Sequence, residues 1–439
     1  MSNLLLLIHS QAGGGPICAV SNGPQQPAFA TQALASAIAE ATRNSGFFLS
    51  SMRSEDCMVA YKVYVTDKSA KNEITLAIKT MDVTLSEKLL MAKLDLIAHT
   101  ISFMLGPTWM RVRHGLLQVA LDGIKPMLAR CLEEDSDSLE FCLGYPEFLP
   151  SEFKFQDAKK KILALKKAIE NEIGSTLGTN SNQARFLDVG AAFYENKIFA
   201  ATSLWPELIV PTDAFCIGNY LQQYPHDTKR ELPCYLIPPK NILPEIKDYV
   251  YLEDRKRAKR LVCFQVVPKL RLVFVVPSGE HTLDQAFHMV QQTILTTKAI
   301  DQLRRTVKEA YSSIPHALGL NNNILCFVYI SKESKRVLRY APKPKGIAEG
   351  SRSVDQTIVS LRHFANISGP EFFFQKHGEK VKCLDFGMKS GDMIMYAAAD
   401  FTGCLFLALP VTIPLGSEGQ IARALLKRIN SLCALHMSS

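Results

Sequence analysis

The chain has 439 residues, of which 47% are apolar and 21% charged, and its formal net charge is +8. A chain of this length exceeds one compact core and favours division into about three domains of ordinary size. No apolar run approaches the roughly 20 residues of a transmembrane helix, and the N-terminal residues lack a cleavage site, so we expect a cytosolic or peripheral protein. The 11 cysteines are scattered singly, which argues against zinc and against a disulfide framework.

The first part of the chain predicts a sheet with helices. Its strands are expected at residues 4–10, 17–21, 47–49, 58–65 and 74–79. An alanine-rich helix is expected at residues 33–42, between the second and third strands. A capping box, Thr84-Leu85-Ser86-Glu87 with Thr84 as the N-cap, predicts a helix over residues 85–105. A further helical segment, residues 112–132, is interrupted at Pro126.

A basic helix is expected next, at residues 153–173. Its lysines include Lys159, Lys160 and Lys166, and they surround an apolar stripe to which Ile169 belongs. Such a helix can lie on an anionic membrane. We favour the alternative, in which the helix is a connector docked on a neighbouring domain with its lysines in water.

The second part is organised around a β-hairpin over residues 259–278, hinged at Pro268 and Lys269. The capping box Thr282-Leu283-Asp284-Gln285 then opens an amphipathic helix. The earlier elements are strands at 186–194, 198–202 and 233–236 and a helix at 211–223. A basic cluster precedes the hairpin and includes Arg255, Lys256 and Arg257. This cluster either contacts phosphoinositide headgroups or an acidic protein, or is a solvated loop, which we favour.

The third part gives the same order again. Strands are expected at 324–330, 336–340, 393–399 and 404–409, and helices at 354–367 and from Ser417 through residue 426. The repeated order of strand, strand, helix, three strands and helix predicts an α+β fold, in which five antiparallel strands carry helices on both faces. The expected domains are residues 1–135, 184–315 and 316–439, with a connector over 136–183.

That order is the one found in longin domains, and the chain resembles the tri-longin subunits of Rab-activating heterodimers. Within this family it is most similar to the subunits that act in planar cell polarity. The segments that carry the resemblance are Pro233-Cys234-Tyr235-Leu236, Pro268-Lys269-Leu270-Arg271-Leu272, Ile74-Thr75-Leu76 and Asn323-Ile324-Leu325-Cys326-Phe327.

The resemblance implies a non-enzymatic subunit of a guanine nucleotide exchange factor that supports ciliogenesis. The implied partners are an Inturned-like tri-longin protein, a Rab-family small GTPase, a WD-repeat subunit and a phosphoinositide membrane at the base of the cilium. In related complexes the first longin units of two chains pair to form the GTPase platform. This architecture places the partner surface on the first helix and the following strand, at Ala33, Leu34, Ala37, Ile38 and Phe48.

The sequence contains no catalytic, metal-binding or cofactor-binding motif in a supportive context. Nucleic acid binding is also unsupported, because the basic clusters lack interleaved aromatic residues. Two other hypotheses remain. The chain is a tri-longin subunit of a late-endosomal or lysosome-related-organelle Rab activator, or it is a trafficking scaffold without exchange activity. A scaffold would bind its GTPase best when GTP is loaded.

Overall fold

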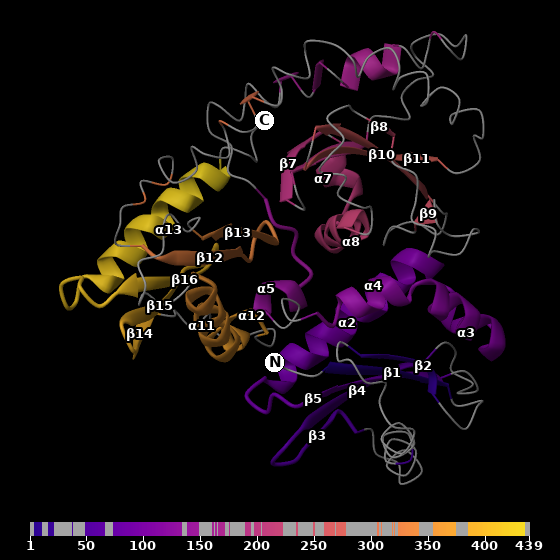
Figure 1. Cartoon of the computed structure of the whole chain (residues 1–439), viewed down its shortest axis with the longest axis horizontal. Helices are drawn as coiled ribbons and strands as arrows, with labels where there is room; N and C mark the ends of the chain where they lie inside the picture. Colours follow the sequence, from indigo (N-terminus) through magenta and orange to yellow (C-terminus); the bar gives the residue numbers. More distant parts are fainter. Residues whose placement is uncertain are drawn as a thin grey trace. The chain divides into compact units, whose positions relative to one another are not determined.

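The computed structural model shows a mixed α+β protein with three antiparallel sheets (Figure 1). It describes residues 4–10, 16–21, 37, 49–65, 73–133, 138–148, 160–161, 163–164, 166–171, 175, 189–194, 197–202, 204–222, 234–235, 249–250, 259–267, 269–277, 305–306, 309, 318, 320, 324–341, 354–374 and 385–434. The chain divides into two compact units. One contains residues 1–144 and 238–259, and the other contains residues 145–237 and 260–439.

The first sheet has five strands in the order β2-β1-β5-β4-β3. Their bounds are β1 Leu4–Ser10, β2 Pro16–Ser21, β3 Ser51–Arg53, β4 Met58–Val65 and β5 Glu73–Thr80. Four of the five strand predictions are confirmed. The strand predicted at residues 47–49 is wrong at Leu49, which precedes β3 and packs against an apolar cluster instead. The segment that leads into β3 begins to pair with β4 at Ser50, the residue after Leu49. There the Tyr61 amide donates to the Ser50 carbonyl at 2.7 Å.

Helices cover one face of this sheet, as Figure 1 shows. Their bounds are α2 Glu87–Leu105, the 3-10 helix η1 Trp109–Arg111, α3 His114–Gly123, α4 Lys125–Arg130 and α5 Leu139–Cys142. The break predicted at Pro126 is confirmed, because α3 ends before it and α4 carries the proline in its first turn. The predicted N-cap is wrong by two residues. Ser86, not Thr84, caps α2 by accepting a hydrogen bond from the Leu89 amide.

The second sheet has four strands of five or more residues, with a two-residue strand added beside β10. The bounds are β6 Gly190–Tyr194, β7 Lys197–Ala201, β8 Cys234–Tyr235, β10 Lys259–Val267 and β11 Leu270–Pro277, with helices α7 Trp205–Leu208 and α8 Pro211–Gln222. Another two-residue strand, β9 Tyr249–Val250, falls in the first unit. The predicted hairpin hinge is confirmed, and Lys269 adopts a left-handed φ of 73° there.

The third sheet repeats the strand order of the first and has α13 on one face and α11 on the other (Figure 1). The bounds are β12 Cys326–Ser331, β13 Arg336–Tyr340, β14 Asp385–Ser390, β15 Met393–Ala399 and β16 Gly403–Pro410, with α11 Val354–Ser368, α12 Pro370–Phe373 and α13 Glu418–Ala434. The last helix is longer than predicted. β14 was not located from the sequence.

All three sheets have the same strand order. Numbered along the chain within each sheet, the strands lie in the order second, first, fifth, fourth, third. When the two-residue strand β9 is left out, the second sheet follows it as β7-β6-β11-β10-β8, and the third follows it as β13-β12-β16-β15-β14. The repetition that the sequence predicts is therefore present in the topology as well as in the order of elements.

The second unit has a continuous apolar core. One cluster contains buried side chains from the second sheet, including Leu272 and Phe274, and from the third sheet, including Tyr329 and Leu405. Residues 146–148 run between β13 and β7. The Phe148 amide donates to the Val337 carbonyl at 2.9 Å, and the Glu147 carbonyl accepts from the Ile198 amide at 2.8 Å. This segment therefore covers one edge of each sheet.

A buried histidine in the first sheet makes stability depend on pH. Burial lowers the pKa of His9 from 6.5 to about 4. The folded state binds the proton less readily than the unfolded chain. The free energy of unfolding is therefore highest above the unfolded pKa of 6.5 and decreases as pH falls towards 4. Between about pH 7.5 and about pH 5 the loss should reach about 2 kcal/mol.

The matching variant is His9→Gln, which cannot titrate. We expect its unfolding free energy, measured by urea denaturation, to fall less on acidification than that of the unchanged protein. Equal acid sensitivity of the two proteins would rule out His9 as the cause.

Candidate interaction surfaces

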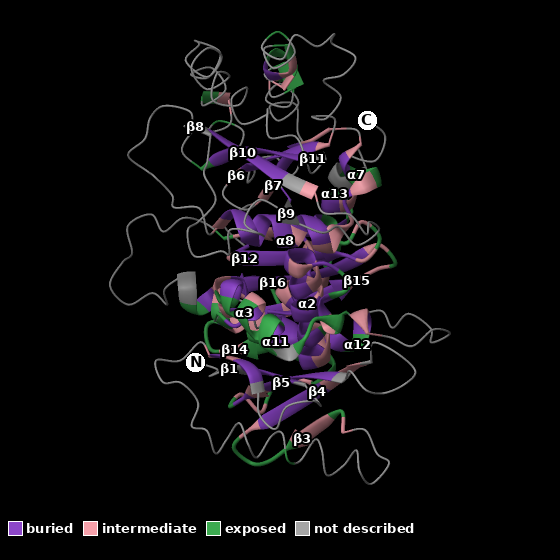
Figure 2. Ribbon diagram, turned by 90° about the vertical axis from the view of Figure 1, so that its right-hand side faces the viewer, coloured by how far each residue is buried: buried purple, intermediate pink, exposed green. Residues whose placement is uncertain are grey.

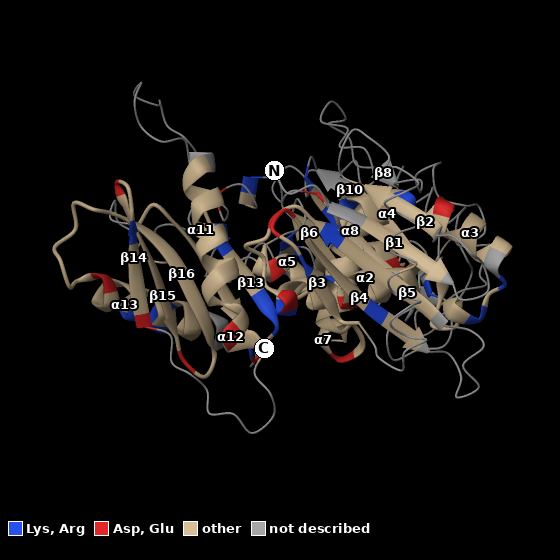
Figure 3. Cartoon of the chain, turned by 90° about the horizontal axis from the view of Figure 1, so that it is seen from below, with Lys and Arg blue, Asp and Glu red and all other residues tan. Residues whose placement is uncertain are grey.

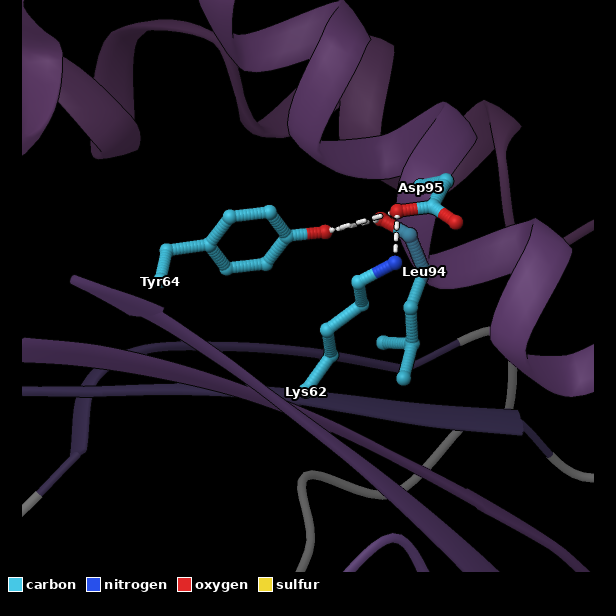
Figure 4. Close-up of polar contacts among 4 residues, drawn as sticks. All are labelled: Lys62, Tyr64, Leu94 and Asp95. Carbon is cyan, nitrogen blue, oxygen red and sulfur yellow. Dashed lines mark hydrogen bonds and ion pairs between the residues drawn. The ribbon is translucent and has the colours of Figure 1, made fainter.

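A polar network ties α2 to the first sheet. Lys62 and Tyr64 project from β4 towards Asp95 on α2, where Lys62 forms an ion pair (Figure 4). The Tyr64 hydroxyl lies 3.2 Å from Asp95 Oδ1 and 3.5 Å from the Leu94 carbonyl oxygen. Burial and the Asp95 charge raise the pKa of Tyr64 above its ordinary value. The hydroxyl therefore stays protonated and donates, and the network acts as a structural link rather than as an acid–base pair.

The opposite face of the first sheet carries an apolar cluster. Leu7, Val59, Tyr61 and Ala77 are buried there. Of the five predicted partner residues the structure describes Ala37, which is helical and exposed. The others, Ala33, Leu34, Ile38 and Phe48, lie outside the described residues. Ala37 is thus available to a partner and can be tested by substitution.

Helix α3 exposes an apolar stripe that sequence analysis missed. The exposed fractions are 65% for Leu116 and 56% for Val119, and the outward face of α3 is green in Figure 2. Leu117 and Leu121, on the same helix, are buried. Apolar residues thus occur on two faces of one short helix, a pattern that was present in the sequence. Only the packing shows which face is outward.

The described part of the basic helix is docked rather than free. Ile169 is fully buried in the core of the second unit. The Lys166 ammonium lies 2.9 Å from Glu170 Oε1, one helical turn away, and both side chains are mostly buried. Lys160 is exposed. Lys159, Arg255, Lys256 and Arg257 lie outside the described residues. These contacts favour the connector interpretation for the stretch around Ile169.

A cleft of about 410 Å³ that contains several charged residues lies between α13 and strands β14 and β15 of the third sheet. Its acidic residues already have partners. Asp385 accepts a hydrogen bond from the Tyr396 hydroxyl at 2.5 Å and pairs with Arg423, and these two contacts hold the pKa of Asp385 below its usual value. Asp400 accepts from the Thr402 amide at 2.8 Å and from Asn430 Nδ2 at 2.9 Å. The cleft therefore lacks a free carboxylate positioned as a general acid or base.

The outermost strand of the third sheet is exposed along its length. The first five residues of β14 are exposed, including Phe386 at 41% and Met388 at 46%. The next two strands inward, β15 and β16, contain no charged residue, are largely buried and are tan in Figure 3. Together with α3, this strand provides the exposed apolar surface that a protein-binding role requires.

No group of three or more His, Cys, Asp or Glu side chains could hold a metal ion within the described ranges. No helix among the described residues is long and apolar enough to cross a bilayer.

The fold is that of an α+β protein with three similarly ordered antiparallel sheets. Comparison with protein-family models found no matching family, and a search of curated proteins found no significant relative.

Proposed function

We propose that the chain is a tri-longin subunit of a Rab-activating heterodimer, of the Fuzzy type that pairs with Inturned in the CPLANE complex. In this role it acts through surfaces and not through covalent chemistry. The pair would bind the nucleotide-free GTPase more tightly than the nucleotide-bound form, so that GDP leaves faster.

The observation that supports the proposal most is the threefold repetition of one strand order in a single chain. Helices flank the sheets, and α11 and α13 enclose the third. The exposed apolar residues of α3 and β14 agree with a protein that binds other proteins. The proposed location is the base of the cilium, where a membrane-bound Rab-family GTPase would be recruited.

The test is release of fluorescent GDP from a panel of Rab-family GTPases. The chain is assayed alone and then after co-purification with an Inturned-like protein. Faster release by the pair, from one GTPase, would support the exchange-factor proposal. A stable pair that accelerates no GTPase would overturn it, and preference for a GTP-loaded GTPase would favour a scaffold.

The variant Ala37→Arg tests the proposed pairing surface. Because Ala37 is exposed, the substitution should leave the fold intact. At an interface it would bury an unpaired charge, so we expect affinity for the partner chain to fall about tenfold or more. Surface plasmon resonance with the purified partner measures this affinity.

The matched control is Ala424→Arg, an exposed alanine on α13 that receives the same change. We expect Ala424→Arg to bind the partner normally. If Ala37→Arg also binds normally while Leu116→Arg does not, the pairing surface lies on α3 and the first helix is not part of it.

A further inference from the structure

Strand β14 is a longer edge strand than those at the corresponding positions of the other two sheets. Within the described residues it pairs with β15 on one side and has no strand on the other. The edge strands at the corresponding positions of the other two sheets are three and two residues long, whereas β14 has six residues and no proline. A long exposed edge presents unpaired backbone groups that favour addition of another strand. On the far side of the same sheet, residues 146–148 cover β13.

The two faces of β14 differ in chemistry. Phe386 and Met388 point to the α11 side, where the Phe386 and Phe364 ring centroids are 5.5 Å apart. Asp385, Gly387 and Lys389 point to the α13 side. Lys389 is exposed and makes no ion pair with the described residues. Within six residues, the strand therefore carries an acidic and a basic residue on one face and two apolar residues on the other.

We propose that β14 pairs in antiparallel register with β14 of a second copy of this chain, centred on Gly387. In this register Asp385 of each copy, which also pairs with Arg423 of its own chain, lies opposite Lys389 of the other, and Phe386 lies opposite Met388. A two-fold axis generates each pair twice, as expected for an isologous interface. Directly opposed residues of antiparallel strands share a face, so the charged pairs and the apolar pairs lie on opposite faces of the joined sheet.

This register is specific because neighbouring registers lose these pairs. Centring the pairing on Phe386 places Asp385 opposite Gly387, and centring it on Met388 places Lys389 opposite Gly387. Gly387 also allows close packing within each copy. A Cβ atom at this position would lie 2.8 Å from the Tyr396 ring. Because the charged and apolar residues of β14 match those of a second, antiparallel β14, the strand identifies a second copy of this chain as its partner.

A two-strand contact buries little surface, so we expect a dimer with a dissociation constant in about the micromolar range or weaker. Sedimentation velocity of the full chain, over concentrations up to about 100 µM, measures it. The variants are Lys389→Asp and Asp385→Lys. Each places like charges opposite each other in a dimer with itself, and we expect each alone to be about tenfold weaker in self-association.

Mixing the two variants tests the register directly. In the mixed dimer the unchanged Asp385 of one chain faces the unchanged Lys389 of the other, and the two substituted side chains, one acidic and one basic, face each other. We therefore expect the mixture to associate as the unchanged chain does. The charge control is Lys335→Asp in the exposed β12–β13 turn, which should leave association unchanged. Asp385→Lys also removes the contacts of Asp385 with Arg423 and Tyr396 in its own chain, so thermal unfolding of each variant checks that it is folded.

Three results would overturn the proposal. One is a chain that stays monomeric over the whole concentration range. Another is unchanged association of either single variant, which would place the interface elsewhere. The third is a folded pair of variants that fails to associate when mixed, which would exclude this register and leave β14 to a strand from another protein.

Discussion

Replacement of Trp109 by alanine should lower the free energy of unfolding by about 3–5 kcal/mol. Trp109 lies in η1, directly after α2, and its side chain is 1% exposed. Its Nε1 donates to Ser102 Oγ at 3.0 Å. The variant would leave a large cavity beneath α2 and would remove this hydrogen bond. Urea denaturation followed by circular dichroism gives the change in free energy.

The control Trp109→Phe keeps most of the ring and removes only the indole N–H. We expect it to cost about 1–2 kcal/mol, because it leaves a smaller cavity and one lost hydrogen bond. Equal stability of the alanine variant and the unchanged chain would mean that Trp109 does not support α2. A large loss for both variants would assign the effect to the hydrogen bond instead of the ring.

Gly403→Ala is expected to destabilise the third sheet by about 2–3 kcal/mol. Gly403 lies opposite Ser331 where β16 pairs with β12. A Cβ atom at Gly403 would lie 2.4 Å from the Ile330 carbonyl oxygen and 3.0 Å from the Ser331 Cα. These are backbone atoms of a central strand and cannot move aside without breaking the pairing.

The matched control is Gly115→Ala in α3, where a Cβ would meet nothing within 4 Å. Gly115 lies in the first turn of α3, where alanine is still favoured over glycine, so this change should stabilise by about 0.5 kcal/mol. Hydrogen exchange of the β12 and β16 amides locates the effect of Gly403→Ala. Unchanged protection of those amides would contradict the expected clash.

The capping error at α2 shows how a local pattern can mislead. Thr84 and Glu87 have the spacing of a capping box, but Asp82 accepts hydrogen bonds from the Thr84 amide at 2.9 Å and from its hydroxyl at 2.5 Å. Thr84 therefore belongs to the preceding turn, and Glu87 accepts from Ser50 across the fold instead. Two side chains outside the pattern decide which hydroxyl caps the helix.

The proposed sites were predicted less well than the fold. The first-helix surface follows from a family resemblance, and the structure describes only Ala37 of it. The exposed stripe of α3 and the edge strand β14 follow from packing. Phe386 and Met388 alternate as they would in a buried strand, so their exposure depends on β14 being the last strand of its sheet.

Apolar, β-branched runs together with the capping patterns were sufficient to predict the long strands and the threefold order of elements, because these signals depend on residues close together in the sequence. The strand order within each sheet, the cover of one edge by residues 146–148 and the exposure of β14 could not be read this way. They depend on pairing between residues far apart in the chain, such as Cys326 with Ala408. The sheet edges that are available for binding are therefore a property of the tertiary structure.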